Sequence, residues 1–400
     1  MDKVCPAPRP FSSVVGSVLF LTLLFFLGFI GRFMFSPLMP TILKDVPMTP
    51  QQVGSVFFLG TIGVLVGSLA AGFVAARIAH RGTLLVSSFG LAAVLGLAYF
   101  AGSAWGLRAI MLLLGFFAGL CQPSVTATVT AMVDRRDWGK ALSVEQAAPP
   151  LSLVAGPLLA VGLLGWFSWR VSLVWVGVLV ALVGGTFLVL RGLADFPGER
   201  PRTELLAPMV RGRSFWLLIL LFALGMGAQV GVYSMLPLYL THEKGVALST
   251  ANTLLGLANV LSLAAVFGAG WISDHLGERA TILGALVLTG TMTILVGALE
   301  GAGMWAAIFL LPAFAVCLFP PAFSALSRIV QPLQRGLAAA LIPPLAFILG
   351  GGLLPIWLGY MGQRYTFSLG FVLTGITVII GSVAAVFIKL LTPEEMEEGC

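Results

Sequence analysis

The sequence is poor in charged residues. Aspartate, glutamate, lysine and arginine make up only 10% of its 400 residues, whereas hydrophobic residues make up 58%. Soluble domains contain about 25% charged and about 45–50% apolar residues. A soluble core cannot hide this much apolar surface, but a lipid bilayer can. The composition therefore excludes an ordinary soluble domain and predicts a polytopic membrane protein.

Residue patterns of enzymes and metal sites are also missing. The four cysteines form no CxxC pair and no spacing typical of metal ligands. The sequence has neither HExxH nor GxSxG, and no nucleotide-binding loop. We therefore expect a protein that is not an enzyme and that uses no cofactor and no metal. The basic residues behind the net charge of +6 lie in short loops between apolar runs, which excludes a face for nucleic acid.

Apolar segments of spanning length fill most of the chain, and crossing a bilayer takes about 20 residues per helix. We predict twelve spans, at roughly 14–42, 50–77, 81–102, 107–133, 139–164, 168–191, 214–241, 249–275, 279–299, 303–328, 335–361 and 365–390. The fold class is thus an all-α integral membrane protein with 12 transmembrane helices. The expected parts are an N-terminal six-helix bundle (1–192), a polar cytoplasmic central loop (193–213) and a C-terminal six-helix bundle with a short acidic tail (214–400).

Lysine and arginine set the expected orientation. With the N-terminus inside, the inner segments hold sixteen of these residues and the outer loops hold five. We therefore expect a multi-pass protein of the inner, cytoplasmic membrane with both termini in the cytoplasm. The chain is expected to act as a monomer in the lipid bilayer.

The two halves resemble each other at an offset of about 194–198 residues. The matching segments are Ser36–Pro40 with Ser234–Pro237, Gly72–Arg77 with Gly270–His275, and Pro149–Leu151 with Pro343–Leu345. Glycine and proline are common in spans and could align by chance, but three matches near one offset favour an internal duplication. Two pseudo-symmetric bundles are typical of transporters whose substrate site lies near the bilayer midplane.

One loop carries a family resemblance. Gly270–Arg279 resembles the G-x-x-x-D-[RK]-x-G-[RK] loop of the major facilitator superfamily, and Gly72–Arg81 is a degenerate first-half copy. Ser152–Pro157 and Gly165–Arg170 resemble further motifs of this family. The resemblance covers nearly the whole chain. It implies the major facilitator fold and secondary active transport by alternating access.

The same resemblance implies a conformational latch at neighbouring helix ends, formed by Asp274, Arg279, Arg77 and Arg81. In the first half Ala76 replaces the acid and Ala79 replaces the glycine, so that latch should be weaker. Met111 stands where many proton-coupled members carry an arginine. The resemblance therefore does not imply a drug/proton antiport built on that arginine.

Two ionisable residues lie deep inside predicted spans, Arg32 in the first and Glu145 in the fifth. A charge at the bilayer centre costs roughly 2.5–3.5 kcal/mol, so both should face a water-filled cavity lined by protein. Arginine stays charged and can hold an anion bidentately, and organic-anion branches of the resembled family carry an arginine in the first span. Arg32 is therefore the predicted anion-binding residue. The alternatives are a permanent structural pairing or a gating role.

Gln229 is the counterpart of Arg32 in the second half, since each lies eight residues before a proline. One arginine and one amide suggest a singly charged anion such as a monocarboxylate. Gly28 and Gly31 are expected to let a ligand approach the backbone beside Arg32. Four more polar residues in apolar spans complete the predicted substrate site, namely Gln122, Ser124, Tyr233 and Gln146. Each of these could instead serve helix packing.

Glu145 is the candidate for proton coupling, because intramembrane carboxyl groups relay protons in transporters. The alternative is a hydrogen-bonded residue at the cytoplasmic rim of the cavity. The sequence thus predicts a transporter of a small organic anion, a small-molecule partner, possible proton symport and no nucleic-acid partner. Two other hypotheses stay open: an efflux carrier for multiple drugs or other hydrophobic compounds, and a non-transport membrane scaffold.

Overall fold

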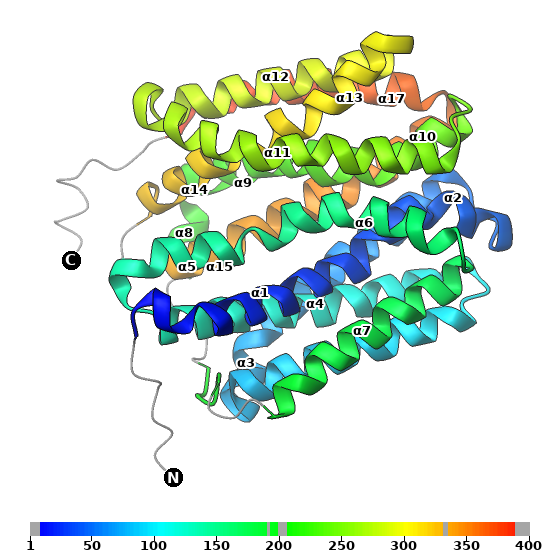
Figure 1. Cartoon of the computed structure of the whole chain (residues 1–400). Helices are drawn as coiled ribbons and strands as arrows, with labels where there is room; N and C mark the ends of the chain where they lie inside the picture. Colours follow the sequence, from blue (N-terminus) through cyan, green and yellow to red (C-terminus); the bar gives the residue numbers. More distant parts are fainter. Residues whose placement is uncertain (1–8, 190–192, 199–205, 331–334, 389–400) are drawn as a thin grey trace. The chain divides into compact units, whose positions relative to one another are not determined.

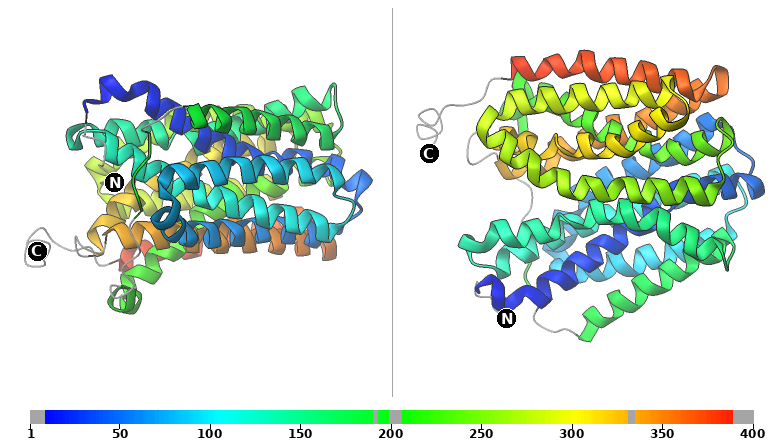
Figure 2. Two further views of the ribbon diagram at one scale, coloured as in Figure 1. Left: turned by 90° about the horizontal axis from the view of Figure 1, so that it is seen from below. Right: turned by 45° about the horizontal axis from the view of Figure 1, so that its top comes forward.

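The computed structural model describes residues 9–189, 193–198, 206–330 and 335–388, and over these residues the chain is helical without a β-strand (Figure 1). Eleven helical segments are long and apolar enough to cross a membrane. One of them, Pro50–Phe100, has 51 residues and is interrupted at Ala79, so it is long enough to cross twice. Figure 2 shows its two parts running side by side. The predicted all-α membrane fold is confirmed.

The helices form two compact units. Unit 1 comprises Met1–Pro47 and Leu59–Pro201, and unit 2 comprises Met48–Phe58 and Arg202–Cys400. Unit 1 contains α1 (Phe11–Phe33), α2 (Phe35–Asp45), most of α3 (Pro50–Leu97), η1 (Ala98–Phe100), α4 (Ala104–Met132), η2 (Arg135–Asp137), α5 (Trp138–Glu145), α6 (Ala148–Leu164) and α7 (Trp169–Val189). The first turns of α3 belong to unit 2, which no feature of the sequence indicated.

Unit 2 continues the helical pattern with more interruptions. It contains α8 (Leu206–Arg211), α9 (Arg213–Met226), η4 (Gly227–Val232), α10 (Tyr233–His242), α11 (Leu248–Leu276), α12 (Glu278–Ala298), α13 (Gly301–Val316), α14 (Phe319–Arg328), α15 (Arg335–Phe347), η6 (Ile348–Leu353), α16 (Leu354–Arg364), α17 (Phe367–Ser382) and η7 (Val383–Phe387). The acidic tail lies outside the described residues. The cytoplasmic position of both termini stays a prediction.

Three of the predicted spans are broken rather than continuous. The breaks fall at Met34, Gln146 and Cys317, and a proline follows each of them three residues later. Proline lacks the backbone N–H, and its ring clashes with the carbonyl four residues back, so it interrupts the helix that precedes it. Each of these three predicted spans is present as one segment long enough to cross a membrane, Phe11–Asp45, Trp138–Leu164 and Gly301–Arg328, with the interruption inside it.

Two other spans of unit 2 contain a π-helical turn, η4 and η6. The two turns pack against each other, and glycine makes this possible. A Cβ atom on Gly350 of η6 would lie 2.5 Å from the backbone nitrogen of Gly227 in η4, so no larger residue fits. Such turns are rare and are frequent at functional sites.

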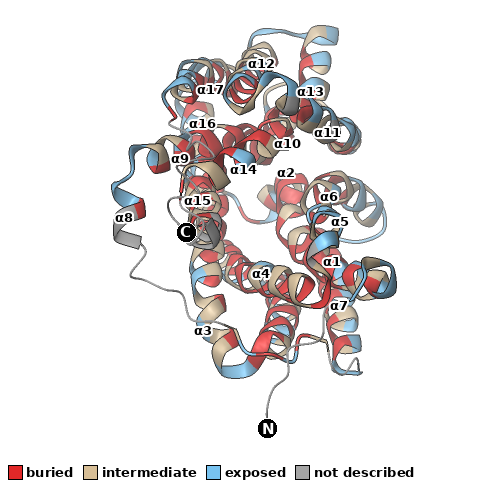
Figure 3. Cartoon of the chain, turned by 90° about the vertical axis from the view of Figure 1, so that its left-hand side faces the viewer, coloured by how far each residue is buried: buried red, intermediate tan, exposed pale blue. Residues whose placement is uncertain are grey.

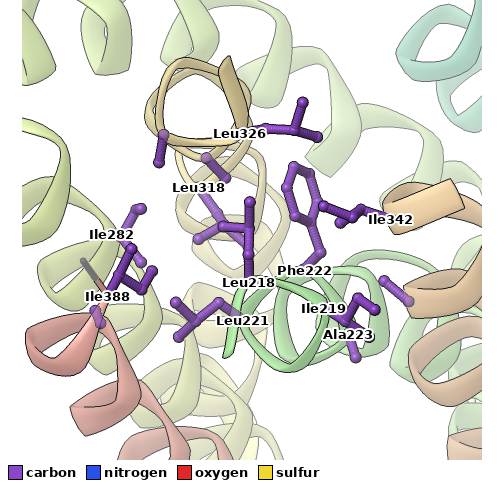
Figure 4. Packing of buried hydrophobic residues seen from close by; sticks show 14 of the residues in the cluster. Leu218, Ile219, Leu221, Phe222, Ala223, Ile282, Leu318, Leu326, Ile342 and Ile388 are labelled. Atoms are coloured by element: carbon purple, nitrogen blue, oxygen red, sulfur yellow. The ribbon is translucent and has the colours of Figure 1, made fainter. Parts of the chain in front are cut away.

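Each unit has its own apolar core. In unit 1, α1 packs against α4, α5 and α6, and Figure 3 shows buried residues where α1 and α4 face each other. In unit 2, Leu218 and Phe222 of α9 meet Leu318 and Leu326 around α14 (Figure 4). The outer faces stay apolar too, as at the exposed Leu182. This is expected of helices that lipid surrounds.

The internal duplication is visible in the structure at an offset of 198 residues. Ala79 and Gly277 both have positive φ, 62° and 81°, at equivalent turns between spans. The indole N–H of Trp169 donates to Asp45 (2.9 Å), and 198 residues later the N–H of Phe367 donates to Glu243 (2.6 Å). Asp45 and Glu243 thus occupy equivalent positions, and in each unit this acid links the end of one span to the start of another.

Candidate functional site

Arg32 lies in the last turn of α1 and is 6% exposed. Its guanidinium carbon lies 4.8 Å from the ring centre of Phe33 and 5.3 Å from that of Phe29. The side chain is therefore enclosed by the protein and does not face acyl chains. Two aromatic faces stabilise a desolvated cation, and the partial negative charge at the end of α1 acts in the same direction. The site is built to hold a buried positive charge.

The glycines beside Arg32 lie against α3. A Cβ atom on Gly28 would lie 3.5 Å from Leu91, and one on Gly31 would lie 3.2 Å from Leu95. Both glycines therefore face leucine side chains of α3, and only at Gly31 would an added Cβ be tight. That a ligand approaches the backbone beside these glycines stays a prediction.

Glu145 is the last residue of α5 and is fully buried. Its Oε1 accepts hydrogen bonds from the Thr126 hydroxyl (2.5 Å) and from the Gln146 amide (3.3 Å). Its Oε2 is buried and has no hydrogen-bond partner in the described part of the chain. A buried polar atom without a partner costs about 1–3 kcal/mol. An oxygen in this position is a place where a proton can bind.

Arg32 and Glu145 lie at different depths of unit 1. A Cβ atom on Gly156 of α6 would lie 4.0 Å from the carbonyl carbon of Phe33, so Gly156 is level with the end of α1. Glu145 precedes Gly156 by eleven residues, which corresponds to about 16 Å of helix. At this separation along unit 1 the two side chains form no direct ion pair.

The other predicted residues of unit 1 are only partly brought together. Gln146 lies at the break after α5 and bonds to Glu145. Ser124 is buried on α4, and its hydroxyl has no hydrogen-bond partner among the residues that the structure describes. Gln122, also on α4, is exposed. Thr126 donates a hydrogen bond to Glu145. Its sequence signal is weak, because the hydroxyl of a lone threonine in a span usually bonds to a carbonyl of its own helix.

In unit 2 the predicted residues Gln229 and Tyr233 share one pocket. The pocket is small, with room for about one water molecule. It is lined by Ala228, Gln229, Tyr233, Leu236, Leu255, Ala258, Asn259, Ile308, Leu311 and Pro312. Asn259 was missed, although an asparagine inside the apolar segment 249–275 is a signal of the same kind as Gln229. Its Nδ2 donates to the Leu255 carbonyl (2.9 Å).

Arg81 of the predicted latch does hold a helix end. Its Nη2 donates to the carbonyls of Phe187 (3.2 Å) and Leu188 (2.9 Å) in the last turn of α7. Its Nη1 lies 3.2 Å from Asp195 Oδ2. The family motif expects an acid at position 76, where this chain has Ala76. Asp195, in the link after α7, supplies an acid to Arg81 instead. The motif alone could not indicate this. The backbone N–H of Arg81 also donates to Ala194 (2.9 Å).

The rest of the predicted latch, Arg77, Asp274 and Arg279, stays a prediction. Arg77 and Arg279 are exposed, and the side chain of Asp274 lies outside the described residues. At the turn of unit 2 the ion pair shown is Glu278 with Arg328 (2.7 Å), which links α12 to α14. Glu278 was missed because the family pattern puts the acid at position 274.

Comparison with known proteins places the chain in a family. The model of the Major Facilitator Superfamily matches residues 21–342 and 240–399. Sugar efflux transporter A of Dickeya chrysanthemi is 28% identical over 376 residues, which cover 88% of this chain and 91% of that protein. The gallate transporter of Pseudomonas putida is 24% identical over 296 residues, 65% of this chain and 66% of the relative.

The fold agrees with this assignment. A bacterial homologue of the human lysosomal transporter Spinster, in an inward-facing and occupied conformation, superimposes with a TM-score of 0.79. It is 16% identical, and the alignment covers 98% of this chain and 99% of that one. The chain therefore belongs to the Major Facilitator Superfamily and is a membrane transporter, not an enzyme.

Proposed function

We propose that this protein is a secondary active transporter of a small organic anion, with Arg32 as the residue that binds the anionic group. The observation that carries the proposal is the enclosed guanidinium at the broken end of α1. A cation kept in the interior of a membrane protein faces a cavity or a partner, and such residues mark substrate pathways. Guanidinium binds a carboxylate through two parallel hydrogen bonds, and this selects carboxylates by geometry as well as by charge.

The single positive charge of the proposed site supports a monocarboxylate as the substrate. The described charged side chains of unit 2 lie at the ends of its spans, and its pocket holds only neutral polar groups. A single guanidinium matches a single carboxylate, whereas a phosphate ester would leave charge unbalanced. The name of the gallate transporter, a relative at 24% identity, fits this class because gallate carries one carboxylate.

We further propose that Glu145 couples transport to protons. One of its oxygens is held by Thr126 and Gln146, which fixes the carboxyl group, and the other is unpaired in the described structure. Protonation there would remove a buried charge, and deprotonation would restore it. The break between α5 and α6 lies directly beside Glu145. A change of charge at this position therefore acts on the point where the span is interrupted.

The test is uptake of radiolabelled gallate and benzoate into proteoliposomes. Arg32→Ala should reduce uptake of both to the level of empty liposomes. Arg108→Ala is the matched control, since Arg108 also lies over an aromatic ring, 4.5 Å from the centre of Trp105, near the start of α4. The control should transport as the parent does. Anion uptake by Arg32→Ala equal to that of the parent would falsify the assignment.

Export of a neutral sugar is the second candidate. The relative at 28% identity, which aligns over 88% of this chain, is named for sugar efflux. Counterflow in the same proteoliposomes separates the two. Exchange of labelled glucose or lactose that does not depend on Arg32 would favour the sugar, whereas exchange of carboxylates that requires Arg32 supports the anion.

A further inference from the structure

We infer that the break between α5 and α6 in unit 1 binds an alkali-metal cation, with Glu145 as its charged ligand. The inference deepens the proposed role of Glu145 in coupling and rests on it, since it adds an ion that competes with the proton for the same carboxylate. The break consists of Gln146 and Ala147 and lies inside the membrane span Trp138–Leu164. α1 packs against both halves of this span, and all of these residues belong to unit 1 (Figure 1).

The two prolines that follow the break leave backbone oxygens without donors. Pro149 and Pro150 have no backbone N–H. The carbonyls of Glu145 and Gln146, each four residues earlier, therefore lack their usual helical donors. α5 also ends at Glu145, so the partial negative charge of a helix C-terminus lies at the same place. Free carbonyls and the C-terminal ends of half-helices coordinate cations in the interrupted spans of transporters.

The side chains at the break add further oxygens and one full negative charge. Glu145 is fully buried, and the Thr126 hydroxyl of α4 lies 2.5 Å from its Oε1. The side-chain amide of Gln146 lies 3.3 Å from the same oxygen, and an amide can also present its own oxygen to a ligand. Oε2 is buried and has no hydrogen-bond partner within the described residues. Carboxylate, amide and backbone oxygens are the ligands that hard cations prefer.

The charge balance favours an ion of charge +1. The ion pairs of the described residues do not include Glu145. The other ionisable side chains on α5 and on the elements packed against it are a thiol, a guanidinium at a different depth, an exposed cation and an exposed pair, namely Cys121, Arg32, Arg136 and Asp137 with Lys140. A buried charge without a partner is costly. A monovalent cation neutralises this carboxylate, whereas a divalent ion would leave a charge unbalanced.

A metal ion satisfies the break more completely than a proton does. A proton can bind one oxygen of the carboxyl group, but the two freed carbonyls would then still lack partners, which is costly for buried backbone groups. An alkali-metal ion can contact the carboxylate, the Thr126 hydroxyl and the carbonyls at once. The unpaired Oε2 of Glu145 and the two carbonyls freed by adjacent prolines together carry the inference.

The experiment measures binding of radiolabelled Na⁺ and Rb⁺, the latter in place of K⁺, to the purified full-length protein in detergent and an alkaline choline buffer. The parent should bind a single cation per chain. Acidifying the buffer should displace it, because a carboxylate must be deprotonated to bind a metal ion. Glu145→Gln should reduce cation binding to the level of detergent without protein.

Variants of α4 test the site without removing its charge. Thr126→Val removes the hydroxyl ligand and should weaken cation binding about tenfold, whereas Thr126→Ser keeps the hydroxyl and should bind as the parent does. Thr128→Val is the matched control, because Thr128 is buried on the same helix and its hydroxyl donates to the Ser124 carbonyl (2.7 Å). It should leave cation binding unchanged. Equal binding by Thr126→Val and the parent would overturn the place of the hydroxyl in the site.

The outcomes separate the cation site from the proposed function. Absence of Na⁺ and Rb⁺ binding by the parent, or unchanged binding by Glu145→Gln, overturns the cation site, and uptake driven by a pH gradient that requires Glu145 would then leave the proton role intact. Cation binding that requires Glu145, together with uptake driven by a Na⁺ or K⁺ gradient but not by a pH gradient, supports the cation site and overturns the proton role.

Discussion

The two units differ in the polar residues that lie inside their membrane spans. Unit 1 holds both ionisable residues found deep in the described spans, Arg32 before one proline break and Glu145 before another. Unit 2 has neutral residues in the corresponding region, with Gln229 inside a π-turn. In both units the polar residue lies where a span is interrupted. Interrupted helices free backbone groups and position side chains at transporter sites. The comparison places the buried charged candidates in unit 1 and the neutral polar candidates in unit 2.

The largest expected effect concerns Glu145. Glu145→Gln keeps the hydrogen bond from Thr126 but cannot release a proton. Uptake driven by an imposed pH gradient should fall to background, while exchange of labelled for unlabelled substrate without a gradient should persist. Both are measured in proteoliposomes. Glu300→Gln in unit 2 is the matched control, since that carboxylate is exposed and pairs with Lys244 at 3.0 Å. Unchanged gradient-driven uptake by Glu145→Gln would remove its role in coupling.

The equivalent turns at Ala79 and Gly277 allow the backbone requirements of the two units to be compared directly. Ala79 has φ 62° and ψ 168°, a conformation that essentially only glycine adopts and that costs another residue about 1–3 kcal/mol. Ala79→Gly should relieve this strain, and glycine's greater freedom in the unfolded chain offsets about 0.4–1 kcal/mol of the gain. We expect a net stabilisation of about 1 kcal/mol. It is measured as a higher midpoint of thermal unfolding in detergent.

The reciprocal change belongs to unit 2. Gly277 has φ 81° at the equivalent position, so Gly277→Ala should lower the unfolding midpoint by a comparable amount. Opposite shifts for the two variants would establish that both turns require the same backbone. A lower midpoint of thermal unfolding for Ala79→Gly would contradict the equivalence of the two turns. It would mean that side-chain contacts alone hold the turn of unit 1.

The smallest effect is expected at the latch of unit 1. Arg81→Gln removes the ion pair with Asp195 and the bonds to the last carbonyls of α7, whereas Asp195→Asn removes only the charge of the pair. Partly exposed ion pairs contribute about 0.2–1 kcal/mol. Arg81→Gln should therefore destabilise the protein more than Asp195→Asn. Thermal unfolding of both single variants and the double variant checks this, and equal effects would show that the helix-end bonds contribute nothing.

The sequence was sufficient for the fold class because spans, loops and duplicated motifs leave strong signals. It did not show which face of a span packs on protein, since these helices are apolar on every side. The contacts of Gly28 with Leu91 and of Gly31 with Leu95 are an example of packing that the sequence did not show.

The candidate site was only partly predictable for a related reason. Arg32, Glu145 and Gln229 could be found because a charge or an amide is rare in an apolar span. Asn259 carries the same signal, but only the pocket shows that it joins Gln229. Asp195 and Glu278 could not be found, because the family motif puts the acids at positions 76 and 274. In the structure Asp195 pairs with Arg81, 114 residues away in the chain, and Glu278 pairs with Arg328, 50 residues away.

The most direct test of the central claim is a structure of the protein with a bound carboxylate such as gallate. The account predicts that the carboxylate oxygens lie about 2.7–2.9 Å from the guanidinium nitrogens of Arg32. A bound ligand away from Arg32, with its guanidinium paired to an acidic side chain of the chain itself, would contradict it.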